Sequence, residues 1–417
     1  MNKKVKRWKK LFLILLVLLL VSQIPFAYRR YRLGRLQNAI QQLNAQRDAS
    51  LDNHGYNEFV GVMHVHSFLG GHSAGNFDEI IMAAKADKLS FVVMTEHESA
   101  HVNTGEMTLK GIHEGVLFVN GNELAQPNAD RVLLVPTLAP SDQIITDSAN
   151  AGYPSNQIGK TLLAGRGKDG LTFVAYPQEF RGWDTTFYDG VEVYNVYTNA
   201  RQINPVVMFF DALWSYRSYP DLLFANFYQR PTANLDKWDH AIASVKRKLV
   251  AVSGNDAHSN VGLSLNDDSG KTLVGLKLDP YERSFRLVRV HVLLPSGVVL
   301  RQESLLEALG AGHCFVGFDL FGDTTGFSYT ATNGVESKLQ GDDIKLSGEV
   351  KLKATSPVSA RFVLLKDGTI VAGDSGLKSK EYTVKERGVY RVEVYLPQLP
   401  GPVKDQPWII SNPIYVK

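Results

Sequence analysis

Histidines gather in one short segment of the chain, GVMHVHSFLGGHSAG at residues 61–75. Three of the eleven histidines in 417 residues fall there: His64, His66 and His72. Residues two apart in an extended strand point to the same face, so His64 and His66 are predicted to lie side by side. Met63 and Val65 are then expected to face the opposite way, into apolar packing. Two imidazoles presented like this can hold one metal ion, although an H-x-H pair alone also arises by chance.

Polar residues that could join these histidines follow several other predicted strands. Runs rich in β-branched and aromatic residues predict strands at 59–67, 89–98, 116–125, 171–179, 190–197, 249–259 and 314–318. All but the last end in polar residues, and these ends offer Glu96, His97, Glu98, Glu123, Asp256 and His258. In parallel α/β sheets and barrels, the carboxyl ends of the strands form the edge that carries the active site. Imidazoles combined with carboxylates suit Zn, Mn or Fe.

The pattern of apolar and polar residues along the chain predicts two folded units. Helical patterns at 77–88 and 235–248 alternate with the predicted strands, which favours a parallel α/β arrangement over residues 57–322. The aromatic-rich stretch 200–234 predicts helices that either pack on the outside of the α/β unit or form a wall of the substrate cleft. Apolar and polar residues alternate over 323–417, which predicts a small antiparallel β-sandwich.

The N-terminal region predicts a membrane anchor. Residues 1–10 carry six basic residues and no acidic one, and an uncharged apolar stretch follows from 11 to 28. A helix of that length spans roughly 27 Å, close to the ~30 Å hydrocarbon core of a bilayer. A cleaved signal peptide is the alternative, but Pro25 stands where cleavage would need a small residue. The prediction is an uncleaved single-pass signal anchor over 11–28 and a helical stalk with a linker over 29–56. The basic excess before the span places the rest of the chain on the outer side of the cell membrane.

Charge and cysteine content restrict the function classes. Residues 1–35 hold ten of the 45 basic residues and none of the 42 acidic ones, so the rest carries 35 basic against 42 acidic, a net charge of −7. A net negative charge over residues 36–417 does not indicate a nucleic-acid-binding surface. The single cysteine, Cys314, excludes an intrachain disulfide and a thiolate metal cluster. Four arginines after the span could contact anionic lipid head groups, namely Arg29, Arg30, Arg32 and Arg35.

Spaced motifs over about residues 57–320 resemble those of the PHP (polymerase and histidinol phosphatase) superfamily of metal-dependent hydrolases. They are the histidines of 61–75, TEH at 95–97, GNE at 121–123, GVEVYN at 190–195 and GNDAH at 254–258. The tail PWIISNPIYV is similar to that of the carbaryl-hydrolase-like branch. The resemblance implies an α/β fold with a distorted (β/α)7 barrel, here preceded by one transmembrane helix and followed by the β-sandwich.

The resemblance also implies which residues bind metal. One ion would be held by His64, His66, Glu123 and Asp256, and a second by His72, His97 and His258. The family often has a histidine where this chain has Tyr176, and residues 124–175 lack another expected histidine. One or two divalent ions are therefore expected (Zn, Mn or Fe), with Glu96 as an outer partner of the ligands. Glu192 of GVEVYN is expected to orient the mouth of the barrel without touching metal.

The chemistry expected from such a site is hydrolysis. A divalent ion polarises an ester oxygen and lowers the pKa of bound water to about 7. The candidate proton carriers are His258, Glu96 and Tyr176. We expect a membrane-anchored phosphoesterase acting on a small-molecule substrate. The alternatives are an amide, ester or carbamate hydrolase on the same site, and a non-catalytic binding module stabilised by metal. A phosphatase pocket should offer Lys or Arg, and the predicted strand ends are short of them.

Overall fold

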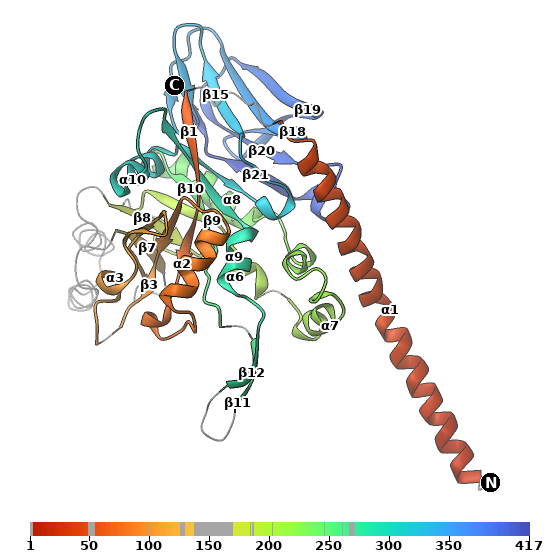
Figure 1. Ribbon diagram of the computed structural model, residues 1–417. Helices are drawn as coiled ribbons and strands as arrows, with labels where there is room; N and C mark the ends of the chain where they lie inside the picture. The colour runs from red at the N-terminus through yellow and green to blue at the C-terminus, as the bar shows by residue number, and fades with distance from the viewer. Residues whose placement is uncertain are drawn as a thin grey trace.

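The structure, a computed structural model, describes residues 3–48, 55–99, 101–125, 130–136, 170–183, 185, 187–201, 203–245, 247–260, 262–266 and 272–417. Its body combines β-sheets with short helices, and one long helix extends from the body toward the N-terminus (Figure 1). The mixed α/β class predicted from alternating strands and helices is confirmed.

The predicted anchor and stalk form one continuous helix, α1 (Lys3–Ala45). Its segment from 11 to 24 carries exposed apolar side chains, and the helix is long and apolar enough to span a membrane. The half that follows packs on the body through Leu33, Leu36 and Leu43, which are all buried. The predicted stalk is therefore a helix that contacts the body along its length, rather than a free spacer.

Arginines just after the apolar segment bind the body of the protein. Arg29 Nε donates to Asp211 Oδ1 at 2.8 Å, and its Nη2 donates to Asp211 Oδ2 at 2.6 Å. Arg30 Nη2 donates to Ser218 Oγ at 3.0 Å. These two arginines, which could have contacted lipid head groups, are thus engaged by the protein.

Two sheets position the candidate site. In the first, β1 (Tyr56–Val65) is parallel to β2 (Phe91–Met94), which is parallel to β5 (Val116–Val119). The second has the order β10-β9-β8-β7-β6-β3. Its strands are β3 (Glu96–His97), β6 (Asn122–Ala125), β7 (Arg131–Val135), β8 (Leu171–Ala175), β9 (Gly190–Asn195) and β10 (Val250–Gly254). The predicted parallel arrangement holds for β3–β6, β8–β9 and β9–β10. It fails at β7, a strand absent from the prediction, which is antiparallel to both β6 and β8.

The two sheets meet where the chain passes from one into the other. β2 leads into β3, and β5 leads into β6, so both segments contribute to both sheets. After β10, Ala257 forms a parallel bridge to Val65 at the end of β1. Asn255 N–H also donates to the carbonyl oxygen of Met63 at 2.9 Å. The C-terminal ends of β1, β3 and β10 are therefore held close together.

β1 is irregular where its histidines lie. Its register with β2 shifts between Val62 and Val65, and His64 has a φ of 63°. Val62 and Val65 pack in one core cluster, whereas Met63 packs in another with Phe91. The prediction that Met63 and Val65 face the same side is therefore wrong, because a bulge interrupts the two-residue alternation.

The C-terminal strands continue the first sheet, whose order is β16-β15-β18-β20-β21-β14-β13-β1-β2-β5-β4. The strands of this sheet not yet given are β4 (Gly111–His113), β13 (Arg289–Pro295), β14 (Cys314–Gly317), β15 (Ser328–Thr332), β16 (Ser337–Leu339), β17 (Asp343–Ile344), β18 (Val350–Lys366), β19 (Thr369–Val384), β20 (Gly388–Tyr395), β21 (Pro407–Ser411) and β22 (Ile414–Val416). A separate two-stranded sheet is formed by β11 (Gly262–Asn266) and β12 (Thr272–Lys277). The antiparallel pairing predicted after residue 323 is confirmed for β15, β18, β19, β20 and β21. β14 joins these strands to β13 and so to β1. The β14–β13 and β13–β1 pairs are antiparallel, so the parallel arrangement predicted over residues 57–322 fails here as well.

Short helices cover the sheets and fix the strands of the site. They are α2 (Phe77–Ala86), α3 (Thr104–Met107), α6 (Val196–Ala200), α7 (Pro205–Ser215), α8 (Thr232–Val245), α9 (Tyr281–Leu287) and α10 (Gln302–Ala311). The helices predicted at 77–88 and 235–248 are confirmed as α2 and α8. On α8, the buried Trp238 donates its indole N–H to the carbonyl oxygen of Leu249 at 2.9 Å, which ties the helix to the start of β10.

A buried histidine away from the site predicts how stability depends on pH. His291 Nδ1 lies 2.6 Å from Glu58 Oε1, and its Nε2 lies 3.2 Å from Asp319 Oδ2. Burial alone would lower the pKa of His291, but Asp319 and Glu58 outweigh it and raise that pKa to about 10. Because the folded pKa exceeds the unfolded one, the stabilisation is full below pH ~6.5 and is lost as the pH rises through about 10.

We expect this group to contribute on the order of 4 kcal/mol at neutral pH, at about 1.4 kcal/mol per pKa unit. In thermal unfolding of the full chain, the melting temperature of wild type should therefore exceed that of His291→Asn, and this difference should narrow between pH 7 and 10.5. The matched control is His313→Asn, since His313 is only half-buried. A gap that stays constant over this range would refute the assignment.

Candidate metal centre

The two strand histidines converge on a pair of buried carboxylates. His64 and His66 are buried, and their ring centroids lie 5.0 Å apart. The Nε2 of His64 lies 3.2 Å from Glu123 Oε2 and 3.6 Å from Asp256 Oδ1. The Nε2 of His66 lies 3.5 Å and 3.4 Å from the same two oxygens. Both imidazoles face one point, as the H-x-H spacing predicts, although the bulge in β1 brings this about.

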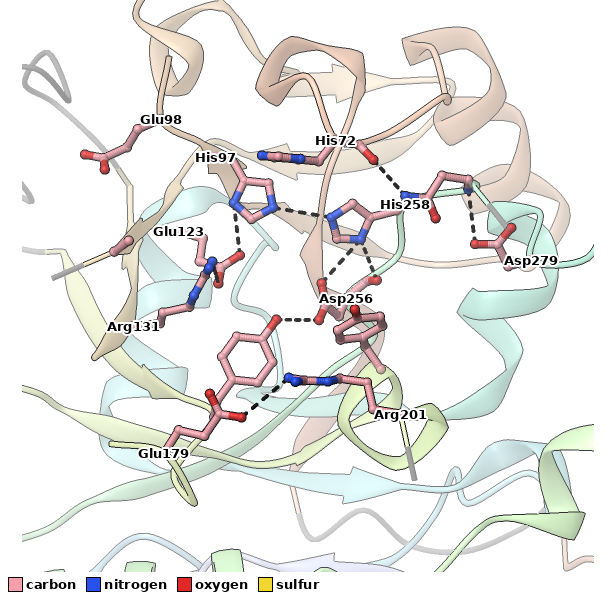
Figure 2. A pocket seen from close by; sticks show the side chains of 14 residues that line it. His72, His97, Glu98, Glu123, Arg131, Glu179, Arg201, Asp256, His258 and Asp279 are labelled. Carbon is pink, nitrogen blue, oxygen red and sulfur yellow. Dashed lines mark hydrogen bonds and ion pairs between the residues drawn. The ribbon is translucent and has the colours of Figure 1, made fainter. Parts of the chain in front are cut away.

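Backbone pairing brings the other candidate ligands to this point. His97 on β3 is the register partner of Glu123 on β6, and His97 Nδ1 lies 3.4 Å from Glu123 Oε2. Asp256 and His258 flank Ala257, the residue that bridges to β1. Figure 2 shows these four side chains gathered around one cavity. Sequence-distant strand ends therefore meet here, as the strand-edge argument predicts.

Backbone strain is concentrated in the same place. His64, Tyr176 and Asp256 have φ values of 63°, 46° and 50°, a left-handed conformation that non-glycine residues rarely adopt. Such a conformation costs about 1–3 kcal/mol per residue and clusters at functional sites. The rest of the fold thus holds these three side chains where they are despite a local cost.

Two groups of three side chains in the described part of the chain have ligand atoms within 4.8 Å of one another. The groups are His64, His66 and Asp256, and His66, His97 and His258. His66 belongs to both, and its ring stacks at 4.3 Å on the rings of His97 and of His258. The first group matches the first predicted ion, and Glu123 borders both groups. The second group contains His66 in the place predicted for His72. His72 is exposed at the rim, with its ring 4.9 Å from that of His97.

Unpaired buried atoms in the site fit a metal ion. Among the described residues, neither ring nitrogen of His66 has a hydrogen-bond partner, and neither does Oδ1 of Asp256. A buried polar atom without a partner costs about 1–3 kcal/mol. Imidazole nitrogen and carboxylate oxygen are the donors that Zn, Mn and Fe accept. The residues present therefore fit a divalent ion.

The charge of the site leads to the same conclusion. Glu123, Glu192 and Asp256 are all buried, and Arg131 Nη1 donates to Glu123 Oε1 at 2.9 Å. Three carboxylates against this one guanidinium leave two negative charges in excess when His64 is neutral, which is the form whose Nε2 can bind a metal ion. A buried charge is strongly destabilising unless it is paired. One divalent cation would balance the group.

Protonation of the imidazoles agrees with metal binding. Burial lowers the pKa of His66 to about 3 and that of His97 to about 4, so both are neutral at pH 7. A neutral imidazole keeps the lone pair that a metal ion needs. Burial also disfavours the charged form of His64, but Glu192 and Asp256 outweigh it and raise the pKa of His64 well above its usual value. The Nε2 of His64 therefore attracts a positive charge, either a proton or a metal ion.

Glu192 on β9 orients His64. Its Oε1 lies 2.6 Å from His64 Nδ1, and its Oε2 accepts a hydrogen bond from Asn195 Nδ2 at 3.0 Å. A carboxylate on the outer nitrogen of a ligand histidine fixes the ring and raises its basicity. Gly254 makes room for this contact, because a Cβ at that position would overlap Glu192 Oε1. The expectation that Glu192 orients the site without touching metal agrees with this geometry.

Glu96 supports the loop that follows β1. Its carboxylate accepts hydrogen bonds from Ser67 N–H at 2.9 Å and from the Thr108 hydroxyl at 2.7 Å. The side chain is buried and does not line the cavity. This placement agrees with an outer partner of the ligands and does not favour Glu96 as a proton carrier.

The other two predicted proton carriers lie in the site. Tyr176, which stands where a histidine was expected, donates its hydroxyl to Asp256 Oδ2 at 2.6 Å. Burial and the neighbouring Asp256 raise the pKa of Tyr176 well above its usual value, so its hydroxyl is a hydrogen-bond donor rather than a base. His258 Nδ1 lies 2.9 Å from the carbonyl oxygen of Asp256, and its Nε2 lies 3.4 Å from His97 Nε2.

The side chains surround a cavity of about 650 Å³, which two arginines also line (Figure 2). Arg131 is the first residue of β7, and Arg201 follows α6, where its guanidinium lies 5.8 Å from the ring centroid of Tyr197 and 3.5 Å from Glu179 Oε1. Sequence analysis missed both. Because β7 runs antiparallel, its first residue reaches the edge where the parallel strands end. Identification of residues 131–135 as a reversed strand would have found Arg131, whereas no motif marks Arg201.

Comparisons with known proteins do not assign the chain to a family. Its sequence matches no protein-family model and no curated protein. Among solved structures it is similar to PsfC from Pseudomonas syringae, with 15% identity and a TM-score of 0.37, over 63% of this chain and 92% of PsfC. A TM-score of that size carries no functional argument, so the proposals below rest on the site.

Proposed function

We propose that the chain is a membrane-anchored, metal-dependent hydrolase of the PHP superfamily that cleaves a phosphoester with metal-activated water. One observation carries the proposal. Four histidines and two carboxylates from separate strand ends converge on one cavity, and buried ligand atoms there have no hydrogen-bond partner in the part of the chain that the structure describes. A divalent ion bound there would polarise a phosphoryl oxygen and lower the pKa of a water to about 7.

The strand pairing supports the distorted (β/α)7 barrel that belongs to this proposal. Hydrogen-bonded neighbours follow one another from β1 through β2 and β5, and from β3 through β6, β7, β8 and β9 to β10. The bridge between Ala257 and Val65 then links the segment after β10 back to β1. In this interpretation the antiparallel β7 is one of the distortions. The proposal also assigns the C-terminal strands to a β-sandwich, on the strength of their antiparallel pairing.

Two arginines favour a phosphorylated substrate over a neutral one. Arg131 and Arg201 both line the cavity, so the shortage of basic residues inferred from the strand ends does not extend to the cavity itself. A guanidinium offers parallel N–H groups that match phosphate oxygens. Arg131 is already bonded to Glu123 at 2.9 Å, whereas the exposed Arg201 has a longer 3.5 Å contact with Glu179 and lies over the ring of Tyr197. Arg201 is therefore the residue better placed to bind substrate.

The position of α1 supports an extracytoplasmic site. Six basic residues precede the apolar segment, and an excess of basic residues marks the cytoplasmic side of a span. The proposed hydrolase would then face outward from the cell membrane, held against the bilayer by a helix that packs on its body.

The phosphoester proposal predicts a substrate-selective effect of Arg201→Gln. Loss of a charge-assisted hydrogen bond of about 1.5–3 kcal/mol should raise KM for an aryl phosphate roughly tenfold or more. The KM of an uncharged aryl ester or carbamate should not change. Steady-state kinetics of the metal-loaded full chain on the three substrates side by side would measure this.

Arg361→Gln is the matched control, because Arg361 also stacks on a tyrosine, with its guanidinium 4.3 Å from the Tyr395 ring centroid, but does not line the cavity. It should leave all three substrates unaffected. Turnover of the ester or carbamate without any turnover of the phosphate would replace the phosphoesterase proposal with the amide, ester or carbamate alternative.

A further inference from the structure

Helix α7 presents an apolar face that the described part of the chain leaves uncovered. Val206, Phe209 and Leu213 are 62%, 57% and 68% exposed, and their spacing places them on one side of the helix. Asn204 caps the N-terminus of the helix, because its Oδ1 accepts a hydrogen bond from Val206 N–H at 2.9 Å. Contiguous exposed apolar side chains mark surfaces that contact a membrane or a partner.

The same helix lies beside α1 at the end of its apolar segment (Figure 1). The rings of Phe26 and Phe210 lie 5.0 Å apart, and Trp214 Nε1 donates to Gln23 Oε1 at 3.0 Å. The ion pair between Arg29 and Asp211 fastens the two helices one turn further along. If residues 11–28 span the hydrocarbon, these contacts fall within the last ~8 Å of the span and the turn after it, at about 1.5 Å per residue.

Side chains typical of a membrane–water boundary surround this contact. Tyr28 and Tyr31 on α1 are both about three-fifths exposed, and Trp214 on α7 is 36% exposed. Tyrosine and tryptophan are enriched at the level of the lipid head groups, where an apolar ring and a polar tip are both accommodated. Arg30 Nη1 binds the carbonyl oxygen of Trp214 at 2.5 Å, so a cation also lies at this level.

We propose that α7 is a second membrane contact, whose apolar face lies in the interfacial layer of the same bilayer that α1 crosses. An amphipathic helix in this layer buries its apolar face between head groups and acyl chains. Tyr197 and Arg201, which line the cavity, directly precede α7 in the chain. Docking of α7 would therefore fix one wall of the cavity relative to the membrane surface. The inference concerns placement and does not depend on the proposed catalysis.

Single-cysteine labelling of the full chain in vesicles of phosphatidylcholine and phosphatidylglycerol tests the proposal. The native Cys314 is buried and its thiol pKa is raised to about 12 by that burial, so it does not compete for the label. A fluorophore at Phe209→Cys or Leu213→Cys should be quenched by lipids brominated near the head group. It should also be at least about fivefold less accessible to aqueous iodide than one at Val335→Cys. Val335 is the control, as an apolar residue 91% exposed on the C-terminal region.

Three outcomes would overturn the proposal. Equal iodide quenching at positions 209 and 335 would show that the α7 face is in water. Protection at 209 that disappears when protein is diluted at constant lipid would show that a second copy of the chain covers the face. A label at Leu18→Cys that is reached by iodide but not by brominated lipid would show that α1 itself does not cross the bilayer. The third outcome would also remove the membrane anchor from the proposed function, on which this inference rests, but none of the readouts uses activity, so none bears on the proposed catalysis.

Discussion

Replacement of His66 by alanine is expected to prevent binding of the proposed metal ion and to abolish the proposed hydrolase activity. His66 is the one residue shared by both candidate metal groups, and its ring packs against those of His97 and His258. Mutation of residues that only orient a ligand costs 10–100-fold in metal affinity, so loss of this ligand should cost more than about 100-fold. Elemental analysis of the purified full chain, followed by zinc and manganese titration, measures the effect.

The apo protein should survive the substitution. Neither ring nitrogen of His66 bonds to any residue that the structure describes, so His66→Ala breaks no hydrogen bond seen there and leaves only a small cavity. Unchanged circular dichroism would separate loss of metal from loss of fold. His240→Ala is the matched control, since His240 is exposed on α8, and it should keep both metal and activity. Wild-type metal content in His66→Ala would show that the metal site lies elsewhere.

Wild-type protein purified without any bound metal would contradict the proposal in a different way. The convergence of the candidate ligand atoms would then need another explanation. The phosphoesterase proposal and the amide, ester or carbamate hydrolase alternative would both be refuted, since they share one metal site. A metal-stabilised binding module would fall as well. Metal retained without turnover on phosphate, ester, amide or carbamate would instead favour that module.

The strand-edge rule explains why most of the site could be predicted from sequence. His97, Glu123 and Asp256 each follow an apolar run that folds as a strand, and parallel strands bring their carboxyl ends to one edge. That rule needs only the order of the strands, not their detailed geometry. It therefore found these residues although they are up to 160 positions apart in the chain.

What could not be predicted depends on departures from regular geometry. The alternation rule assumes an unbroken strand, and the bulge at His64 moved Val65 to the face opposite Met63. Arg131 was not predicted because β7 is short and antiparallel to its neighbours. Its first residue, not its last, therefore lies at the edge where the parallel strands end. The continuity of α1 depends on contacts such as Arg29 with Asp211, which involve residues 182 positions apart. Long-range contacts of this kind leave no local pattern in a single sequence.

The substitution Gly254→Ala is expected to damage the site although it removes no candidate ligand. A Cβ at this position would overlap Glu192 Oε1 and come within 3.0 Å of His64 Cβ. Glu192 is buried and cannot swing into water, so its bond to His64 must break or β10 must move away from β9. Breaking a buried charged pair costs about 3–5 kcal/mol. Metal affinity should fall by about 10–100-fold, since His64 loses the group that orients it.

Chemical unfolding and metal titration of the full chain measure both effects, with Gly373→Ala as the matched control. Gly373 also lies in a strand, and its Cβ would meet only a carbonyl oxygen at 3.8 Å, an ordinary contact. Its unfolding free energy should therefore change by no more than about 0.5 kcal/mol. Equal effects of the two substitutions would show that Gly254 has no special packing role in this site.

A double-mutant cycle isolates the cause. Glu192→Ala removes the carboxylate that the new Cβ would strike, so Gly254→Ala should add little to the damage that Glu192→Ala causes alone. Residues in contact show such non-additivity, whereas independent residues have additive effects. Full additivity would mean that Gly254→Ala acts through His64 or the backbone of β10 instead. Strong non-additivity would establish that a glycine is required on β10 because the carboxylate of Glu192, on the neighbouring β9, must reach His64 on β1.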